Sequence, residues 1–510
     1  MDTTHQKVEL LPRLVLHLRF LAPLMLLSWW LAWKFQDPFI SDWDGFDYTV
    51  SIVRGLPSPL GLGRALFIGF YHEVWRLLRH FDLLRNEESY LILRYGSILL
   101  SGPAVAGIYA LTHELTRNRL AALLAGLLLA LSPYFIIYSG RSMSETPGLF
   151  ILAWSLWALA RSLHSRSQPR RRFFLIMISA ILIGLAANVR EIAIFYLPFI
   201  PLAILLAGER LWIAVASISL ATLSSLSGMV YWILKRGYLY WDEVMIWYRL
   251  SASERRHYPV TIRNFTLFSE YAYECSVATV ILVPLAFALL WPRKERRTLL
   301  ILGLIGLVAN MTMLINHDLS VNPRYLLTGM VGLAPVCGWA LADLYDHTPV
   351  RARLLLAGLL TITLASLIRI WPDYHWQSRN AVAAAAYLNR IRDFPWNSGF
   401  IVGARSPLIN FYMGIEARPE WKTISPGSGW PDDRLGQAVD DLLLAGRFVY
   451  VDFDPEIWQY GERGSSREEK GLRMIRQRYC LRHIDKQLYL IDEPQVFTGA
   501  QDKIAGWEKP

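Results

Sequence analysis

The chain has few charged residues and few cysteines for its length. Only 18% of its 510 residues are charged, whereas 54% are hydrophobic. A soluble enzyme of this size needs more charge and fewer apolar residues to cover its surface, so the composition excludes that class. Its three cysteines allow at most a single disulfide, so the fold does not depend on a disulfide framework.

The basic excess of the chain does not indicate a nucleic-acid partner. The formal net charge is +10, but the Lys and Arg residues fall in short runs between long apolar segments. A protein that binds DNA or RNA gathers its basic residues on a single folded face. Short basic runs between apolar segments are instead typical of cytoplasmic loops in a membrane protein. We therefore expect membrane lipids as partners and no nucleic acid.

Charge is also almost absent from the middle of the apolar segments. Arg94 lies near one end of its segment, and Asn310 is the most notable interior polar residue. Ion-coupled transporters usually place acidic, histidine or lysine side chains at the bilayer midplane, where a relay or an ion site must be polar. This absence argues against a transporter.

Long apolar runs predict about eleven membrane-spanning helices, since a bilayer core needs roughly 20 residues per helix. Basic clusters precede the first run and follow the second, fourth, sixth, eighth and tenth, so they share one side. That side is cytoplasmic by the positive-inside rule, which places the N-terminus in the cytoplasm and the C-terminal segment outside. We expect the membrane to be the plasma (inner) membrane, because we recognise no eukaryotic targeting signal in the sequence. The predicted spans are 14–33, 90–113, 119–138, 146–163, 173–188, 191–208, 211–234, 273–291, 299–315, 325–345 and 353–371.

The first outer loop, residues 34–89, contains a segment that resembles a further span. Residues 62–80 are strongly apolar but carry Arg64, His72 and Glu73. Counting this segment as a span would also put the basic run before the fifth span on the outside. We therefore predict an amphipathic helix that lies along the outer membrane interface.

The apolar runs end near residue 371, and the sequence divides there into two predicted domains. We expect residues 1–371 to form a transmembrane domain and residues 372–510 to form an extracytoplasmic domain. Alternating helices and strands predict a small soluble α/β domain for the second part. The fold class is thus a polytopic α-helical membrane protein with a C-terminal α/β domain. The elements expected in the second domain are helices at 379–392, 432–445 and 466–478 and strands at 400–402, 448–452 and 487–491.

Polar and charged residues gather at the predicted outer ends of the spans. Acids and arginines that converge there would form a polar cavity able to hold an anionic lipid headgroup. The alternative is that outer loops are simply solvated. The candidate substrate-binding residues are Asp42, Asp47, Tyr48, His72 and Glu73 of the first loop and Arg141, Glu145, Arg190, His317, Arg324 and Tyr325 of later turns.

Three carboxylates follow the first span within six residues, at Asp42, Asp44 and Asp47. Two acids in a D-x-D pattern, here Asp42 and Asp44, can bind a hard divalent cation such as Mg²⁺ or Mn²⁺ through oxygen. A single acid can instead act as general base toward an acceptor hydroxyl or amine.

The outer arginines suit a phosphate ligand. A guanidinium group makes bidentate, charge-assisted bonds to phosphate, and it lowers the barrier to substitution at a sugar carbon by stabilising a departing phosphate. Arg141, Arg190 and Arg324 are the candidates. The alternative is that each pairs with a neighbouring acid.

Three segments carry a resemblance to a known family. Residues 44–48 read Asp-Gly-Phe-Asp-Tyr, residues 57–61 read Pro-Ser-Pro-Leu-Gly, and residues 131–134 read Leu-Ser-Pro-Tyr, with Tyr138 and Glu145 beyond them. These are similar to an Asp-Glu-x-x-Tyr pattern, a Pro-Pro-Leu motif and the junction of the third and fourth spans in the GT-C superfamily of membrane glycosyltransferases. The layout of the whole chain is also similar. The nearest branch contains the protein O-mannosyltransferases and the bacterial aminoarabinose transferases of lipid A.

The resemblance implies a glycosyltransferase that uses a polyprenyl-phosphate sugar as donor at the extracytoplasmic face. It makes Asp44 the catalytic acid, which takes or orients the proton of the acceptor during an inverting attack. Asp42 and Asp47 would bind a divalent ion or shape the pocket. Gly45 stands where the family has Glu, and the His or Lys before Pro-Pro-Leu is missing, which leaves the subfamily, the sugar and any metal open.

Two alternatives remain beside this prediction. A polyprenyl-linked lipid or polysaccharide transporter without catalysis would share the lipid groove and the many spans. A ligase that uses a pyrophosphate-linked oligosaccharide would depend more on a metal ion and on the long loop at 235–272. The acceptor, whether protein, lipid or glycan, is unknown from the sequence.

Overall fold

The computed structural model describes residues 3–40, 43–57, 64–165, 168–237, 242, 245, 262–316, 323–401, 406–415, 420–424, 432–453, 471–485 and 488–494. Two compact units form, Met1–Ala385 and Ala386–Pro510. The boundary between them falls inside the long helix α16 (Pro349–Ile391).

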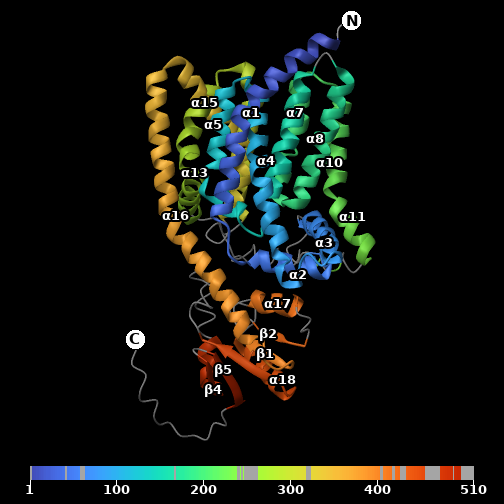
Figure 1. The fold of residues 1–510 in the computed structure, drawn as a ribbon, viewed down its shortest axis with the longest axis vertical. Helices are drawn as coiled ribbons and strands as arrows, with labels where there is room; N and C mark the ends of the chain where they lie inside the picture. Colours follow the sequence, from blue (N-terminus) through green and yellow to red (C-terminus); the bar gives the residue numbers. More distant parts are fainter. Residues whose placement is uncertain are drawn as a thin grey trace. The chain divides into compact units, whose positions relative to one another are not determined.

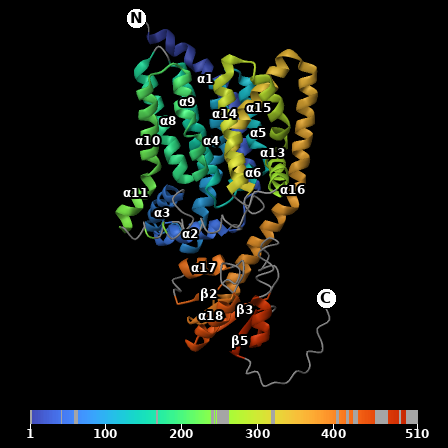
Figure 2. The same ribbon diagram turned by 180° about the vertical axis from the view of Figure 1, so that it is seen from behind.

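The first unit is a bundle of long helices that run along a common direction (Figures 1 and 2). Their apolar sequences favour burial in a bilayer, where a helix satisfies all of its own backbone hydrogen bonds. Besides α16, the bundle contains α1 (Thr3–Lys34), α4 (Tyr90–Thr116), α5 (Arg119–Ala130), α6 (Pro133–Ser139), α7 (Glu145–His164), α8 (Pro169–Val189), η3 (Glu191–Tyr196), α9 (Phe199–Leu206), α10 (Leu211–Ser225), α11 (Ser227–Arg236), α13 (Ile262–Leu290), η4 (Lys294–Arg296), α14 (Arg297–Asn316), η5 (Pro323–Leu326) and α15 (Leu327–His347).

The described helices include several that are long and apolar enough to cross a membrane. Among the described residues five helices meet this criterion, and six do if the bent pair of α5 and α6 counts as one span. Glu191–Leu206 and Cys275–Leu290 are shorter apolar helices. The chain is thus a multi-pass membrane protein, while the total of about eleven spans stays a prediction.

Two short helices lie across one end of the bundle, in the chain segment that joins α1 to α4 (Figures 1 and 2). They are α2 (Trp43–Arg54) and α3 (Ala65–His80), followed by the short η2 (Asn86–Glu88). One face of α3, which includes Phe67 and Ile68, is buried. The segment predicted as an amphipathic helix is therefore helical and lies at an end of the bundle.

The predicted span 119–138 is two helices that meet at an angle of 64°. The hydroxyl of Ser132 accepts a hydrogen bond from the backbone N–H of Phe135, and Pro133 occupies the first turn of α6. Such a cap followed by proline starts a new helix rather than continuing the old one. The bend directs α6 toward the turn at residues 140–144, which leads into α7.

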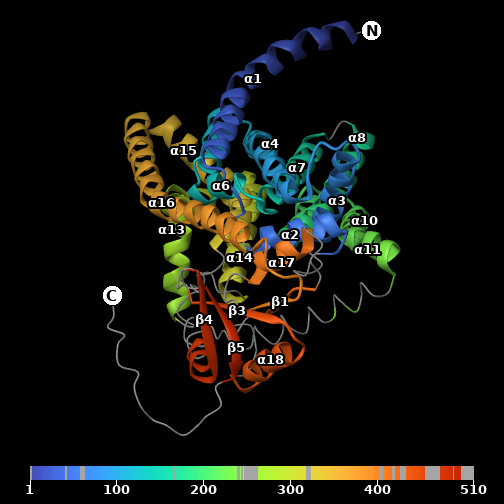
Figure 3. The same cartoon turned by 60° about the horizontal axis from the view of Figure 1, so that its bottom comes forward.

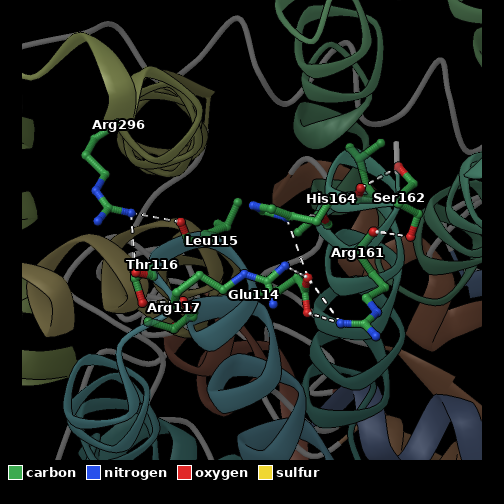
Figure 4. Close-up of polar contacts among 12 residues, drawn as sticks. Glu114, Leu115, Thr116, Arg117, Arg161, Ser162, His164 and Arg296 are labelled. Carbon is green, nitrogen blue, oxygen red and sulfur yellow. Dashed lines mark hydrogen bonds and ion pairs between the residues drawn. The ribbon is translucent and has the colours of Figure 1, made fainter. Parts of the chain in front are cut away.

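At the end of the bundle opposite to α2 and α3, the buried acid Glu114 joins α4 to α7 (Figure 4). The Glu114 side chain is 5% exposed, and Arg117 approaches its Oε1 at 2.6 Å. Arg161 of α7 approaches its Oε2 at 3.1 Å, and Nδ1 of His164 lies 3.5 Å from Oε1. These contacts hold the two helix ends together.

The second unit contains a five-stranded sheet with the strand order β2-β1-β3-β5-β4. β1 pairs in parallel with β2 and β3, whereas β5 pairs antiparallel with β3 and β4. The aromatic ring of Phe400 packs against the rings of Trp421 and Tyr450 in this unit. Figure 3 shows the sheet beside α18. The elements are β1 (Ser398–Ile401), α17 (Ser406–Ile415), β2 (Lys422–Ile424), α18 (Asp432–Leu444), β3 (Phe448–Asp452), a helix at 471–478, β4 (Tyr479–Asp485) and β5 (Leu488–Pro494).

Candidate functional site

A cluster of buried charges lies at the end of the bundle where α2 and α3 are found. Asp44 stands in the first turn of α2, where the helix N-terminus favours a carboxylate. Nη2 of Arg324 donates a hydrogen bond of 2.5 Å to Oδ2 of Asp44. The hydroxyl of Tyr48, one turn further along α2, donates to the same oxygen at 3.5 Å. Asp44 is thus held at the centre of the cluster by residues from α2 and η5.

Glu145, the first residue of α7, is shared between two arginines. Its Oε1 lies 2.9 Å from Nη2 of Arg190 and 3.1 Å from Nε of Arg324. Each of the three side chains is at most 5% exposed. Nε and Nη1 of Arg190 and Oε2 of Glu145 form no hydrogen bond to a described residue. Buried polar atoms without such bonds are uncommon and often mark a functional site.

A third arginine, Arg64, completes the cluster from the residue before α3. It lies 3.9 Å from Oδ2 of Asp44 and 3.3 Å from Oε1 of Glu191. Burial opposes its charge, but Glu191, Tyr48 and Asp44 together hold the pKa of Arg64 well above its usual value. For Tyr48, in contrast, burial raises the pKa of the side chain, so its phenol stays neutral.

Aromatic rings line the same cluster. The guanidinium carbon of Arg190 lies 4.6 Å from the centre of the Tyr325 ring. Arg324 lies 5.8 Å from that ring and 5.9 Å from the ring of Tyr138. Cation–π contacts of this kind hold an arginine in place without neutralising its charge. The arginines are therefore oriented while they remain able to bind an anion.

A neighbouring set of buried charges is formed by Asp37, Arg94 and Arg141. Nε of Arg141 lies 3.3 Å from Oδ2 of Asp37, and Arg94 donates a short hydrogen bond to the backbone oxygen of Asp37. The ring of Tyr138 lies 4.9 Å from the guanidinium carbon of Arg141. Arg141 thus pairs with an acid, as one alternative from the sequence expected, and it shares Tyr138 with Arg324.

Asp47 differs electrostatically from Asp44. Burial, together with the nearby negative charge of Asp44, raises the pKa of Asp47 to about 7. A carboxyl group with this pKa is partly protonated at neutral pH, and it can give or accept a proton there. The two acids lie one turn apart on α2. Asp44 contacts Arg324 and Arg64, whereas Asp47 has a raised pKa.

Two glycines allow the close approach of the elements that carry the site. A Cβ at Gly45 would lie 2.9 Å from Cγ2 of Ile40 and 3.4 Å from the backbone oxygen of Ser142. A Cβ at Gly148 would lie 2.8 Å from Cβ of Arg190. At Gly45, α2 thus packs against Ile40 and against the turn before α7, which leaves little room for a side chain after Asp44.

Other residues predicted for the site lie elsewhere. Nδ1 of His72 lies 2.6 Å from the backbone oxygen of Ile52, and burial lowers the pKa of His72. Glu73 lies 2.9 Å from Arg76 and accepts a hydrogen bond from Tyr231 of α11, which lowers the pKa of its carboxyl. These two residues connect α3 to α2 and α11, and no described contact joins them to Asp44. The predicted site residues Asp42 and His317, and the Pro-Ser-Pro-Leu-Gly segment from residue 58 onward, lie outside the described residues.

The described surroundings of Asp44 do not fit a divalent cation. The groups nearest to its carboxylate are the guanidinium groups of Arg324 and Arg64, which would repel a metal ion. Within the described ranges, no group of three or more His, Cys, Asp or Glu side chains could hold a metal.

Three members of these clusters were not selected from the sequence, namely Arg64, Asp37 and Arg94. Arg64 belongs to a segment predicted to lie along the membrane interface, so its buried position was not expected. Asp37 closely follows the first helix, and Arg94 lies one turn into α4. A charged residue beside an apolar run at a helix end was the only available signal for all three.

Comparison with known proteins supports the predicted resemblance. Residues 77–233 match the family of dolichyl-phosphate-mannose-protein mannosyltransferases. A comparison with curated proteins finds no match. The structure of ArnT from Cupriavidus metallidurans bound to undecaprenyl phosphate is similar over 94% of this chain and 98% of that chain, with a TM-score of 0.61 and 12% identity.

An archaeal structure shares the fold as well. The oligosaccharyltransferase AglB from Archaeoglobus fulgidus, in complex with an inhibitory peptide and a dolichol-phosphate, is similar over 90% of this chain and 72% of that chain, with a TM-score of 0.54 and 12% identity. At these identities the likeness establishes the fold alone. Together with the family match over residues 77–233, this likeness bears out the predicted resemblance to the GT-C superfamily of membrane glycosyltransferases.

Proposed function

We propose that the chain transfers a sugar from a polyprenyl-phosphate carrier to an acceptor at the extracytoplasmic membrane face. The observation that carries this proposal is the group of three buried arginines, Arg64, Arg190 and Arg324, around Asp44 and Glu145. Buried guanidinium groups at the end of a helix bundle can hold a phosphate at the depth of a lipid headgroup. ArnT and AglB have been solved with such lipids, undecaprenyl phosphate and a dolichol-phosphate.

In the proposed mechanism, the donor phosphate binds Arg324 and Arg190 in place of their acidic partners Asp44 and Glu145. The 2.5 Å pair between Arg324 and Asp44 then opens, which frees Oδ2 of Asp44. The acceptor attacks the anomeric carbon, the bond from that carbon to the phosphate oxygen breaks, and the acceptor proton moves to Asp44. The polyprenyl phosphate leaves with the bonding electrons, stabilised by the arginines. Attack opposite the phosphate inverts the anomeric configuration.

The proposed orientation follows from the charge at the two ends of the bundle. The basic turns at 117–119, 170–172, 293–297 and 351–353 lie at the end opposite to Asp44, as the course of the helices requires. The positive-inside rule assigns that end to the cytoplasm, so the Asp44 cluster faces outward from the plasma membrane. In this arrangement residues 372–510 are extracytoplasmic.

The test of this proposal is transfer by an Asp44→Asn variant. Membranes containing the full chain are incubated with radiolabelled polyprenyl-phosphate sugars, and label that leaves the carrier for protein, lipid or glycan is counted. Loss of a base in the transition state lowers the rate by about 10²–10⁴-fold. Asp82→Asn is the matched control, because the Asp82 side chain is 89% exposed on the same chain segment. Equal transfer by Asp44→Asn and wild type would remove Asp44 from the reaction.

A further inference from the structure

An apolar cavity of about 250 Å³ lies between α16 and the neighbouring helices α5, α13 and α15. Its lining includes Leu128 of α5, Ala278 of α13, Leu341 of α15, and Ala357 and Leu360 of α16. Engineered apolar cavities of about 150 Å³ already accept benzene and stay free of water. This cavity therefore has the size and the lining for a segment of hydrocarbon chain.

The helix that closes the cavity packs loosely on the bundle. α16 stands at its edge beside α13 and α15 (Figures 1 and 3). Only 17% of an apolar 18-residue stretch within Pro349–Arg369 is buried. Leu360 is 50% exposed although it lines the cavity. A hydrocarbon chain in the cavity would add contacts to α16 that the protein itself does not supply.

Three turns at one end of these helices are joined by polar contacts and form one rim. They lie at residues 115–119, 291–297 and 343–353. Arg293 makes a bidentate pair with Asp343 at the end of α15, with distances of 2.6 and 2.9 Å. Arg296 donates to the backbone oxygen of Leu115 at the end of α4, at 3.2 Å. Arg353 of α16 donates to the hydroxyl of Tyr345 at 3.4 Å. The rim thus joins the adjoining ends of α4, α13, α15 and α16. The cavity begins further along the helices, where Leu341 of α15 and Leu356 of α16 are the lining residues nearest to the rim.

The rim carries an excess of positive charge. Its exposed acids are Glu295 and Asp346, while Asp343 is already paired with Arg293. Trp291 at the rim is 74% exposed, as is common for tryptophan at a membrane interface. We name as the basic rim the exposed residues Arg119, Lys294, Arg297, Arg351 and Arg353.

We infer that the cavity and the basic rim together bind an anionic phospholipid, with an acyl chain in the cavity and the phosphate at the rim. Basic pockets between membrane helices recognise anionic headgroups, and each Lys or Arg near the surface adds to the attraction. Arg353 lies one turn before the cavity residues Leu356 and Ala357 on the same helix. A phosphate bound by Arg353 therefore lies about one helical turn from the nearest cavity residues of α16.

This lipid is distinct from the proposed sugar donor. Arg324 lies just before α15, whereas Arg351 and Arg353 of the basic rim lie just after it, and α15 has 21 residues. At 1.5 Å per residue, the two ends of α15 are about 30 Å apart. A headgroup at the basic rim therefore lies in the other leaflet from a phosphate held by Arg324, and the inference does not depend on glycosyl transfer.

The test measures lipid binding by the full chain, purified in detergent and stripped of lipid. Phosphatidylglycerol is titrated, with phosphatidylcholine of the same acyl chains in parallel, and binding is followed by native mass spectrometry and by the thermal midpoint. We expect phosphatidylglycerol to raise the midpoint and phosphatidylcholine to have little effect. The double variant Arg351→Gln/Arg353→Gln should weaken phosphatidylglycerol binding roughly 30-fold, because it removes two headgroup cations.

A second variant tests the cavity separately from the charges. Ala357→Phe fills the cavity and should abolish the shift caused by phosphatidylglycerol. Ala365→Phe, an exposed position on α16 outside the lining, should leave that shift intact. Equal shifts with both lipids, or a full shift in Ala357→Phe, would overturn the inference. So would Ala357→Phe losing binding of a polyprenyl phosphate while it keeps that of phosphatidylglycerol, because the cavity would then hold the polyprenyl chain.

Discussion

At the scale of single residues, the candidate site is a set of buried ion pairs that a ligand could rearrange. Glu145 is the acid common to Arg190 and Arg324, and neither arginine can reach water, since their side chains are 2% and 5% exposed. Removing one partner of a buried pair leaves an uncompensated charge, which costs far more than the pair itself contributes. The acids of the cluster are therefore needed for stability as well as for chemistry.

Glu145→Gln should for this reason destabilise the protein strongly. The substitution keeps the shape of the side chain but leaves Arg190 and Arg324 without their shared acid, at a cost of about 3–5 kcal/mol. The thermal midpoint in detergent measures the effect, with Glu88→Gln on the exposed η2 as control. An unchanged midpoint would show that the two arginines do not depend on Glu145.

Asp47 gives a pH-dependent prediction. Its pKa in the folded protein, about 7, lies above the ordinary value of 3.8 because of burial and then of Asp44. Below the ordinary pKa of 3.8, Asp47 is protonated in both states, and its raised pKa costs the folded state nothing. As the pH rises from there through about 7, the unfolded chain releases the proton more readily, and the folded protein loses stability. Asp47→Asn removes this penalty. Its midpoint should exceed that of wild type at about pH 8, and the difference should shrink toward about pH 4.

The control for this pH series is Asp82→Asn, which removes an exposed carboxyl from the same chain segment. A constant difference between Asp47→Asn and wild type across the series would contradict the raised pKa of Asp47.

The sequence allowed most of the charged site residues to be chosen but not their partners. Asp44, Glu145, Arg190 and Arg324 were selected because acids and arginines gather at the predicted outer ends of the spans, where they could hold an anionic headgroup. Their pairing depends on which helix ends are neighbours in space, which no local pattern contains. Arg64 was missed for the same reason, because its burial results from the packing of α3 against the bundle.

At the scale of helices, the predicted spans coincide with observed helices, but breaks and extensions were not predicted. α16 continues without interruption to Ile391, where the sequence predicted a span ending at 371 and a separate helix at 379–392. α13 begins at Ile262 and is kinked at Ser276, whereas the predicted span starts at 273. Hydropathy detects apolar length, but a polar continuation of the same helix leaves no apolar signal.

The arginines at the two ends of the bundle differ in their exposure to water. Glu114 is buried, but its partners Arg117 and Arg161 are 47% and 38% exposed. Glu114→Gln should therefore cost only about 1 kcal/mol, because the arginines can turn to solvent. The drop in thermal midpoint should be clearly smaller than that of Glu145→Gln. An equal or larger drop would mean that the contacts in Figure 4 anchor α4 and α7 more strongly than their exposure suggests.

At the scale of the whole molecule, the apolar runs predicted a multi-pass membrane protein, and the alternating helices and strands after residue 371 predicted a C-terminal α/β part. The structure contains both the helix bundle and a mixed five-stranded sheet. The strands β1, β3 and β5 fall close to predicted strands, whereas β2 and β4 were not predicted. β2 has three residues, and β4 is an exposed strand rich in charge, so neither shows a clear alternation of apolar and polar residues.

The central claim is that the buried arginines hold the phosphate of a polyprenyl-linked sugar, and retention of that lipid tests it most directly. The full chain is purified in mild detergent, and native mass spectrometry measures binding of polyprenyl-phosphate sugars to wild type, Arg324→Gln and the control Arg79→Gln, whose arginine is 49% exposed on α3. We predict specific retention by wild type and the control, and binding weakened about tenfold or more in Arg324→Gln, because a charge-assisted bond to phosphate is lost. No retention in excess carrier lipid, or equal retention by all three proteins, would contradict the account.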